Sequence, residues 1–293
     1  MAQIIDGKAI AAEIRAELKD KVEELFRTKG VKPGLALLLV GDDPASKIYV
    51  NMKGKACAEI GIYSITERMA EDVSEEEVLN KVKSWNADPS IHGILVQLPL
   101  PKHIDTNKVI DTIDPLKDVD GFHPVSAGNL MMGKPGFVSC TPAGIMELIK
   151  RTGIETSGKH VVVVGRSNIV GRPVANLLSQ KAKGANAIVT LCHSAAKDLS
   201  YYTKQADIIV AAIGVPELIK GDDVKEGVAV IDVGINRVED ASLEKGYRMC
   251  GDCHYESVSA KASYITPVPG GVGPMTIAML MNNTYLSALQ HTN

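Results

Sequence analysis

Four polar side chains in the first half of the sequence have the types and positions needed to act on a small molecule. Tyr49 and Lys53 are four residues apart in a predicted helix, so they share one of its faces. Gln97 ends the apolar run IHGILVQ, and Asp120 lies in the loop sequence KDVDGF. Gln97 therefore falls at the carboxyl end of a buried strand, where ligands bind in open α/β sheets. A tyrosine packed on a surface lysine stem is the simpler interpretation of the first pair.

A glycine turn in the second half, in the sequence VVVVGRSNIVGRP, suits the phosphates of a dinucleotide. The valines predict a strand that turns at Gly165 into a helix, whose free N–H groups and dipole attract phosphate. The usual G-x-G-x-x-G spacing is not kept, because Ser167 replaces the second glycine and Gly171 comes late. However, the Ser167 hydroxyl can donate to phosphate, and the Arg166 guanidinium suits bidentate phosphate contact. An ordinary strand–turn–helix corner is the alternative.

The end of the next predicted strand favours NADP over NAD. NAD sites usually carry a carboxylate there, which binds the ribose 2′-hydroxyl. Here the strand ends in LCHSAAKD, which places Ser194 at that point and no carboxylate before Asp198. With Arg166 opposite, a 2′-phosphate fits better. The later turns AAIGVPE and IDVGINR also follow strands, so Ile235 in the second of them is a further cofactor-site candidate.

Other chemistries are disfavoured by their motifs. The sequence CGDCH (250–254) matches a haem-attachment pattern, but such attachment follows export, and zinc would need a second ligand pair. We therefore expect Cys250 and Cys253 to be functionally idle. KDVDGF is no EF-hand, because Leu116 and Ala127 stand where acidic ligands are required. The sequence has no nucleophile elbow, H-E-x-x-H or phosphate-binding loop motif, and we expect no metal.

Helical and strand patterns alternate along the chain, which predicts an α/β fold. In the first half, one helix is expected over 8–28, a second with Ser46 as its N-cap, and a third that starts with a capping box of Ser74 and Glu77. Buried strands are expected over 34–41 and 91–97. In the second half, four short apolar runs predict a parallel sheet with covering helices; these are 161–164, 187–191, 207–214 and 228–234. Thr141 is expected to cap a helix that begins at Pro142, and Pro274 to begin the last helix; the loop 131–140 is expected to separate two domains.

Charge and composition narrow the class of protein. The 293 residues carry a net charge of −3, which offers no basis for binding nucleic acid or an anionic membrane. The first twenty residues hold no uninterrupted apolar stretch, and no apolar run approaches the length of a membrane span, so we expect neither a secretory signal nor a membrane anchor. Five cysteines, an odd number, favour free thiols in a reducing compartment. We expect a cytoplasmic protein.

Seven sequence blocks, in order and spread from about residue 34 to 280, resemble the signature blocks of the bifunctional methylenetetrahydrofolate dehydrogenase/cyclohydrolases. They are GDDPASKIYVNMKGKACAEIGI, GILVQLPLP, KDVDGFHP, CTPAGIMELI, VVVVGRSNIVGRPVANLL, IDVGIN and ITPVPGGVGPMTIAML. The resemblance implies an enzyme of one-carbon metabolism that oxidises 5,10-methylene-tetrahydrofolate with NADP and hydrolyses the methenyl product to 10-formyl-tetrahydrofolate. One departure is CGDCHYESV, where the family usually has a glycine-aspartate-valine run.

The resemblance also implies an architecture and a set of roles. Two α/β domains flank a cleft, the second with a Rossmann-like doubly wound parallel sheet, and the protein is a homodimer. The folate-binding catalytic domain is 1–140, completed by the helix 274–293, and the NADP-binding domain is 141–273. The family's roles fall on these residues: catalytic Lys53 with its partner Gln97, stacking Tyr49, pterin-binding Asp120, substrate-binding Pro267 and Gly271, and cofactor-binding Gly165, Arg166, Ser167, Ser194 and Ile235.

Two other functions compete with this one. A dehydrogenase with a single activity, on folate or on a small hydroxy or amino acid, would lack the hydrolase, which the presence of both Lys53 and Gln97 argues against. A non-catalytic NADP-binding sensor would leave the Tyr–Lys–Gln–Asp set without a purpose. A trifunctional enzyme with a synthetase is excluded, because the chain has no room for it and no phosphate-binding loop.

Overall fold

In a computed structural model that describes residues 2–243 and 245–292, the chain forms two compact units of helices and parallel strands. The six-strand unit comprises Met1–Ala11 and Thr141–Thr276, and the three-strand unit comprises Ala12–Cys140 and Ile277–Asn293. Two long helices, α1 (Gly7–Lys29) and α10 (Val272–Gln290), contribute residues to both units. The predicted α/β class is confirmed. None of the helices in the described part of the chain is long and apolar enough to cross a membrane.

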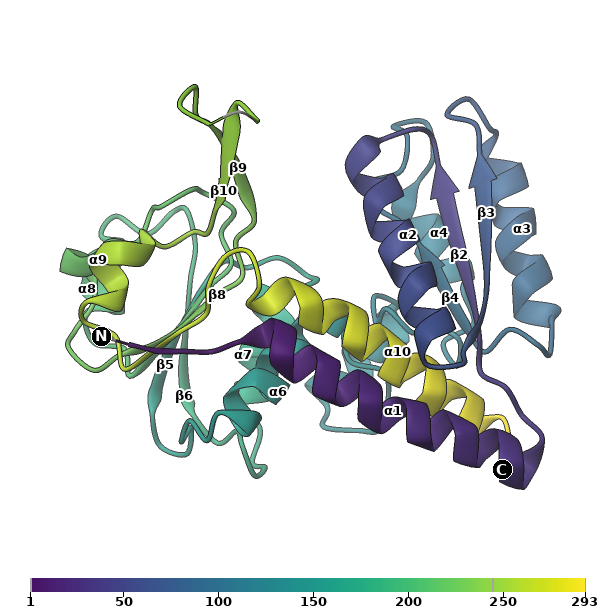
Figure 1. Cartoon of the computed structure of the whole chain (residues 1–293), viewed down its shortest axis with the longest axis horizontal. Coiled ribbons are helices and arrows are strands. Elements are labelled where there is room, and N and C mark those ends of the chain that lie inside the picture. The colour runs from purple at the N-terminus through teal and green to yellow at the C-terminus, as the bar shows by residue number, and fades with distance from the viewer. Residues whose placement is uncertain (1, 244, 293) are drawn as a thin grey trace. The chain divides into compact units, whose positions relative to one another are not determined.

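The three-strand unit is built on a parallel sheet in the order β3–β2–β4. Its central strand β2 (Gly34–Val40) is buried at every residue, as its continuous apolar run predicts for a strand covered on both faces. The edge strand β3 (Tyr63–Met69) was not predicted, because its sequence YSITERM is partly exposed and largely polar. Strand β4 (Gly93–Val96) completes the sheet, and Figure 1 shows α2 (Pro44–Glu59) and α3 (Glu75–Ala87) on either side of it.

Local capping explains where the helices of this unit begin. Asp43 caps α2, since its carboxylate accepts the Ser46 backbone N–H at 2.7 Å. Ser46, the predicted cap, already lies inside the helix. The predicted capping box of α3 is confirmed, with Ser74 and Glu77 each accepting from the other's backbone N–H.

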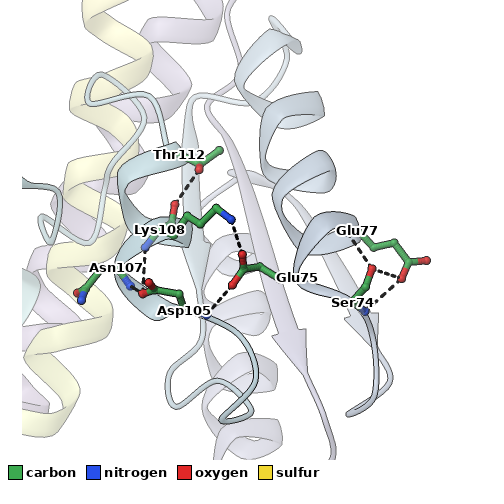
Figure 2. A network of polar contacts seen from close by, with 7 residues as sticks. All are labelled: Ser74, Glu75, Glu77, Asp105, Asn107, Lys108 and Thr112. Carbon is green, nitrogen blue, oxygen red and sulfur yellow. Dashed lines mark hydrogen bonds and ion pairs between the residues drawn. The ribbon is translucent and has the colours of Figure 1, made fainter.

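A polar network joins the start of α3 to the segment after Gln97 (Figure 2). Glu75 accepts from the Lys108 ammonium at 2.5 Å and from the Asp105 backbone N–H at 2.9 Å. Asp105 in turn caps α4 (Thr106–Thr112) by accepting from the backbone N–H groups of Asn107 and Lys108. The loop that leads away from β4 is therefore fixed at its far end. A last short helix, α5 (Pro124–Met131), follows the KDVDGF loop.

The six-strand unit holds a parallel sheet in the order β1–β11–β8–β7–β5–β6. Its strands are β1 (Gln3–Ile4), β5 (His160–Val164), β6 (Ile188–Cys192), β7 (Ile208–Ala211), β8 (Ala229–Asp232) and β11 (Tyr264–Ile265). The four longer ones match the four predicted apolar runs. The remaining elements are α6 (Cys140–Arg151), α7 (Gly171–Ser179), α8 (Leu199–Thr203), the 3₁₀ helix η1 (Gly221–Asp223) and α9 (Tyr255–Ser259).

An antiparallel hairpin of β9 (Asn236–Glu239) and β10 (Tyr247–Cys250) projects from the six-stranded sheet (Figure 1). It was not predicted, and it connects the IDVGIN turn to the CGDC segment. Two helices also begin earlier than predicted. Helix α6 begins at Cys140, where Thr141 was expected as the N-cap and Pro142 as the first residue, and α10 begins at Val272 rather than Pro274. Proline fits the first helical turn without loss of a hydrogen bond, so it does not have to be the first residue.

Candidate active site

Lys53 and Gln97, which lie on different elements of the three-strand unit, meet in a hydrogen bond. The Lys53 ammonium donates to Gln97 Oε1 at 2.9 Å, and the lysine side chain is 8% exposed although it carries a charge. The Gln97 amide also donates from Nε2 to the Leu98 carbonyl at 2.9 Å, so its oxygen must face the lysine. Gln97 follows β4, and Leu98 is joined to Pro99 by a cis peptide bond. An ammonium group is thus held at the carboxyl end of a buried strand.

Asp120 is the third polar group at this place. Burial raises the pKa of its carboxyl, and the nearby Lys53 ammonium acts in the opposite direction. The buried Cys140 thiol lies beside it, and its pKa is raised well above the ordinary value by burial and by the Asp120 charge. A small, mainly apolar pocket adjoins Asp120, with Val96, Leu98 and Phe122 among its walls. The site therefore combines an ammonium, a carboxyl and an apolar surface.

The neighbouring Asp118 is bonded within its own loop. It is 1% exposed, and its carboxylate accepts from the backbone N–H groups of Phe122 and His123 and from the Ser126 hydroxyl. It therefore shapes the loop that holds Asp120. The loop is further tied down by Lys117, which is also buried and donates from Nζ to three backbone carbonyls at the end of α3. Burial lowers the pKa of Lys117.

Ser139 and Asn283, from two other segments, pack on the loop that holds Asp120. Gly121 has a φ of +71° and lies so close to the backbone of Ser139 that a Cβ would collide with it. Asn283 of α10 donates from its side-chain amide to the Val119 carbonyl at 2.9 Å. The position of Asp120 is thus set by contacts on both sides of the loop.

Tyr49 lies one turn before Lys53 on α2, as predicted, and is 40% exposed. Its ring is therefore available to a ligand that approaches Lys53. The α2 segment around it also exposes the apolar side chains of Ile48 and Met52, at 60% and 46%.

The glycine turn of the six-strand unit has the form of a nucleotide-binding corner. Gly165 has a φ of +125°, and a Cβ on it would collide with the Ala212 carbonyl oxygen, so the backbone can turn this tightly only at glycine. The Ser167 hydroxyl accepts from the backbone N–H groups of Val170 and Gly171 at the start of α7, at 3.1 and 3.3 Å. Its own hydrogen therefore remains available for a phosphate oxygen.

The side chains predicted to bind a 2′-phosphate are gathered at the ends of two paired strands. Val164 of β5 pairs with Cys192 of β6, which sets the Gly165 turn beside the residues after Cys192. Arg166 and Ser194 are both exposed there. Arg166 Nη1 is 3.4 Å from His193 Nε2, so His193 joins this group, which sequence reasoning did not foresee. The position of His193 directly before Ser194 was the one feature of the sequence that could have indicated this.

Three more predicted site residues lie in the six-strand unit. Ile235 follows β8 and is 48% exposed. Pro267 and Gly271 belong to the segment between β11 and α10, which contains a cis bond between Val268 and Pro269. Gly271 is buried against Thr266 and Pro267, where a Cβ would not fit.

The cysteines of CGDCH are both buried, at 7% and 2% exposed, and all five cysteines of the chain are free thiols. Among the described residues, no group of three or more His, Cys, Asp or Glu side chains is arranged to hold a metal ion. The residue between the two cysteines, Asp252, is fully buried and was not considered a functional candidate.

Two family models match this chain, and together they cover most of it. The "Tetrahydrofolate dehydrogenase/cyclohydrolase, catalytic domain" matches residues 5–120, and the "Tetrahydrofolate dehydrogenase/cyclohydrolase, NAD(P)-binding domain" matches residues 139–292. The chain is 57% identical over 283 residues to the bifunctional protein FolD of Chlorobium luteolum, with 96% of each chain covered.

Solved structures give the same result. The bifunctional FolD enzyme of Campylobacter jejuni superposes with a TM-score of 0.93 at 50% identity, covering 99% of both chains. The methylenetetrahydrofolate dehydrogenase-cyclohydrolase of Trypanosoma brucei, complexed with NADP cofactor and inhibitor, has a TM-score of 0.92 at 41% identity, covering 99% of this chain and 97% of that one.

Proposed function

The chain belongs to the tetrahydrofolate dehydrogenase/cyclohydrolase family, and from this premise we propose which residues carry each of its two reactions. The enzyme oxidises 5,10-methylene-tetrahydrofolate to the 5,10-methenyl form with NADP, and then hydrolyses that product to 10-formyl-tetrahydrofolate. We propose that the folate-binding domain is 1–140 with the helix 274–293 and that the NADP-binding domain is 141–273, although Met1–Ala11 belong to the six-strand unit. The hydrogen bond between Lys53 and Gln97 is the observation on which the assignment depends most.

Hydrolysis is assigned to Lys53. Water adds to the cationic methenyl carbon and loses a proton. The bond from that carbon to the ring nitrogen N5 then breaks, N5 takes up a proton, and the new hydroxyl gives its proton to solvent as it becomes the formyl oxygen. The neutral amine form of Lys53 can accept the first proton and, as the ammonium, return a proton to the nitrogen, which is general base and then general acid catalysis. Gln97 holds the amine in place through its 2.9 Å hydrogen bond. Asp120 binds the pterin ring, and Tyr49 stacks on it from the exposed face of α2.

The cofactor residues are Gly165, Arg166, Ser167, Ser194 and Ile235. The tight turn at Gly165, packed against Ala212, brings the backbone to the start of α7, which supplies the positive end of its dipole, and the Ser167 hydroxyl has a hydrogen to donate, so the turn fits NADP. NADP held there would supply the acceptor for a hydride from the methylene carbon. Arg166 and Ser194 bind the 2′-phosphate, and Pro267 and Gly271 line the folate side of the reaction.

A combined assay tests this assignment. The protein is given 5,10-methylene-tetrahydrofolate and NADP, and the absorbance of the methenyl product and of the reduced cofactor are followed together. Hydrolysis is then measured separately on supplied 5,10-methenyl-tetrahydrofolate. We expect both turnovers in the unmodified protein. NADP binding without either turnover would support the non-catalytic sensor instead, and hydride transfer without hydrolysis would support the single-activity dehydrogenase.

We also propose that the enzyme is a homodimer in the cytoplasm. Strand β6 is an edge of the six-stranded sheet, and Ile188 and Leu191 on it are 65% and 38% exposed. An exposed apolar edge strand is an association surface. The mass in solution, measured by light scattering, should be twice the chain mass, and Ile188→Lys should lower it toward the monomer. A reducing compartment suits the five free thiols.

A further inference from the structure

Asp252, in the CGDC segment, reaches two loops of the six-stranded sheet from a fully buried position. Its Oδ2 accepts the backbone N–H groups of Ile213 and Gly214, at 2.8 and 2.9 Å. Its Oδ1 accepts from the Asn236 side-chain amide at 2.9 Å. Ile213 and Gly214 belong to the loop after β7, and Asn236 begins the hairpin after β8. One carboxylate thus holds both loops at the carboxyl edge of the sheet.

A second buried carboxylate supports the first. Asp232 ends β8 and is 3% exposed. Its Oδ1 accepts the backbone N–H groups of Gly234 and Asp252, at 3.0 and 2.9 Å, and its Oδ2 accepts that of Cys253 at 2.8 Å. Its own N–H donates to the Thr266 hydroxyl at 2.7 Å.

The two carboxylates leave little freedom to the segments they hold. A Cβ on Gly234 would collide with the Asp252 carboxylate, and a Cβ on Gly251 would collide with that of Asp232. The backbone therefore packs directly on the carboxylates, without intervening side chains. All the oxygen atoms of both groups accept hydrogen bonds from the protein, which offsets the cost of their burial.

The contacts continue from Asp252 to the glycine turn. Ile213 directly follows Ala212, whose carbonyl oxygen is the atom against which Gly165 packs. A displacement of the Ile213 and Gly214 backbone therefore moves the wall of the Gly165 turn. Ile235 is affected in the same way, because its two neighbours, Gly234 and Asn236, each donate a hydrogen bond to one of the carboxylates.

We propose that Asp252, supported by Asp232, is a positioning residue for the dehydrogenase reaction. It holds the loops after β7 and β8, here called the cofactor loops, in the geometry that binds NADP. This inference rests on the proposal that NADP binds at the Gly165 turn. It assigns a role to the CGDC segment that does not involve its two thiols. It also predicts that the role is specific to the cofactor, because the groups that donate hydrogen bonds to the two carboxylates lie in the loops after β7 and β8 and in the CGDC segment.

The test compares three variants in the full-length protein. Asp252→Ala removes both acceptors; Asp252→Asn keeps one oxygen for the Ile213 and Gly214 N–H groups but without the charge. Asp222→Ala is the matched control, because Asp222 is in the same unit but fully exposed, with only a distant partner in Lys261 at 3.7 Å. The measurements are the Kd and KM for NADP, the KM for methylene-tetrahydrofolate, and hydrolysis of supplied methenyl-tetrahydrofolate without cofactor.

We expect Asp252→Ala to raise the Kd and KM for NADP at least about tenfold, and Asp252→Asn about threefold, because hydrogen bonds to a charged acceptor are the stronger ones. Hydrolysis and the KM for folate should stay within about twofold, and the control should behave as wild type. If Asp252→Ala does not fold, Asp252→Asn decides. A folded Asp252→Asn with wild-type NADP affinity, or an equal loss of hydrolysis, would overturn the inference.

A fourth variant separates this inference from the proposed cofactor site. If Arg166→Ala leaves NADP affinity unchanged, the cofactor site itself is assigned wrongly. If Arg166→Ala weakens NADP binding while both Asp252 variants bind it normally, only the positioning role is wrong.

Discussion

Replacing Lys53 by methionine should separate the two reactions of this enzyme. Methionine preserves most of the buried stem and removes only the amine that bonds to Gln97 at 2.9 Å. General acid–base catalysis contributes about 10²–10⁴-fold, so hydrolysis should fall at least about 100-fold. Hydride transfer depends on alignment of two rings, which Tyr49, Asp120 and the cofactor turn still provide, and its loss should be smaller.

We expect the Lys53→Met variant to fold. Lys53 is 8% exposed, so the methionine side chain stays buried, and the loss of a buried charge removes a desolvation cost. Against this, Gln97 Oε1 loses its donor, which costs about 1–3 kcal/mol. Because the Lys53 charge opposes the raised pKa of Asp120, that pKa should rise further in the variant, and the folate KM should be measured at more than one pH.

Two comparisons make the result interpretable. Lys55→Met changes an exposed lysine two residues further along α2 and should leave both reactions at the wild-type rate. Gln97→Ala should lower both reactions, because it frees the Lys53 amine from its working position. Hydrolysis and NADP reduction are assayed separately, after folding and NADP binding have been checked. Hydrolysis near the wild-type rate in Lys53→Met would refute the proposed role of the lysine.

Three further predictions follow from the same structure. Arg166→Ala should raise the KM for NADP about tenfold or more and leave the KM for NAD nearly unchanged, because the guanidinium is expected to meet the 2′-phosphate; equal kcat/KM for the two cofactors in the unmodified protein would contradict this. Cys250→Ser combined with Cys253→Ser should lower the Tm, because both thiols are buried, but leave both turnovers within about twofold; stoichiometric zinc in the purified wild-type protein would contradict it. His92 should make the protein sensitive to acid, because burial lowers its pKa to about 4. The folded state then binds fewer protons than the unfolded state between pH 6.5 and 4, so the free energy of unfolding falls as the pH drops through this range, by about 2 kcal/mol at pH 5. His92→Asn can still accept the Gly34 N–H that now bonds to His92 Nδ1, and its Tm should depend less on pH over this range; an unchanged pH dependence would show that His92 is not the group responsible.

The elements that position the site could largely be predicted from the sequence, because long buried strands and amphipathic helices have a clear period. Strand β2 and the four main strands of the six-stranded sheet were found in this way. Strands β1 and β11 were missed, because each is two residues long and is defined only by its pairing with a distant partner. The order β3–β2–β4 does not follow the chain, so the adjacency of the segments that carry Lys53 and Gln97 is a property of the sheet.

Within the loops, residue type alone does not assign a role. Asp118 and Asp120 are two residues apart in one loop, yet Asp118 accepts three hydrogen bonds that shape the loop, while Asp120 lies beside Lys53. No periodicity distinguishes them. Asp252 was missed for a related reason: its partners Ile213 and Gly214 are 39 and 38 residues away, and only the fold brings them together.

The residues proposed for the two reactions are distributed unequally between the units, and this has a consequence for how substitutions act. Lys53, Gln97 and Asp120 all belong to the three-strand unit, whereas Arg166 and Asp252 belong to the six-strand unit. Hydrolysis requires only water and proton transfer at a bound methenyl group, so it should be insensitive to substitutions at Arg166 and Asp252. Hydride transfer requires both sets, so it should respond to either. Each reaction can therefore be lost separately: hydrolysis with much of the dehydrogenase kept, through Lys53, and the dehydrogenase with hydrolysis kept, through the cofactor loops. Substitutions at Arg166 or Asp252 that lowered both reactions equally would mean that the cofactor loops also hold the folate.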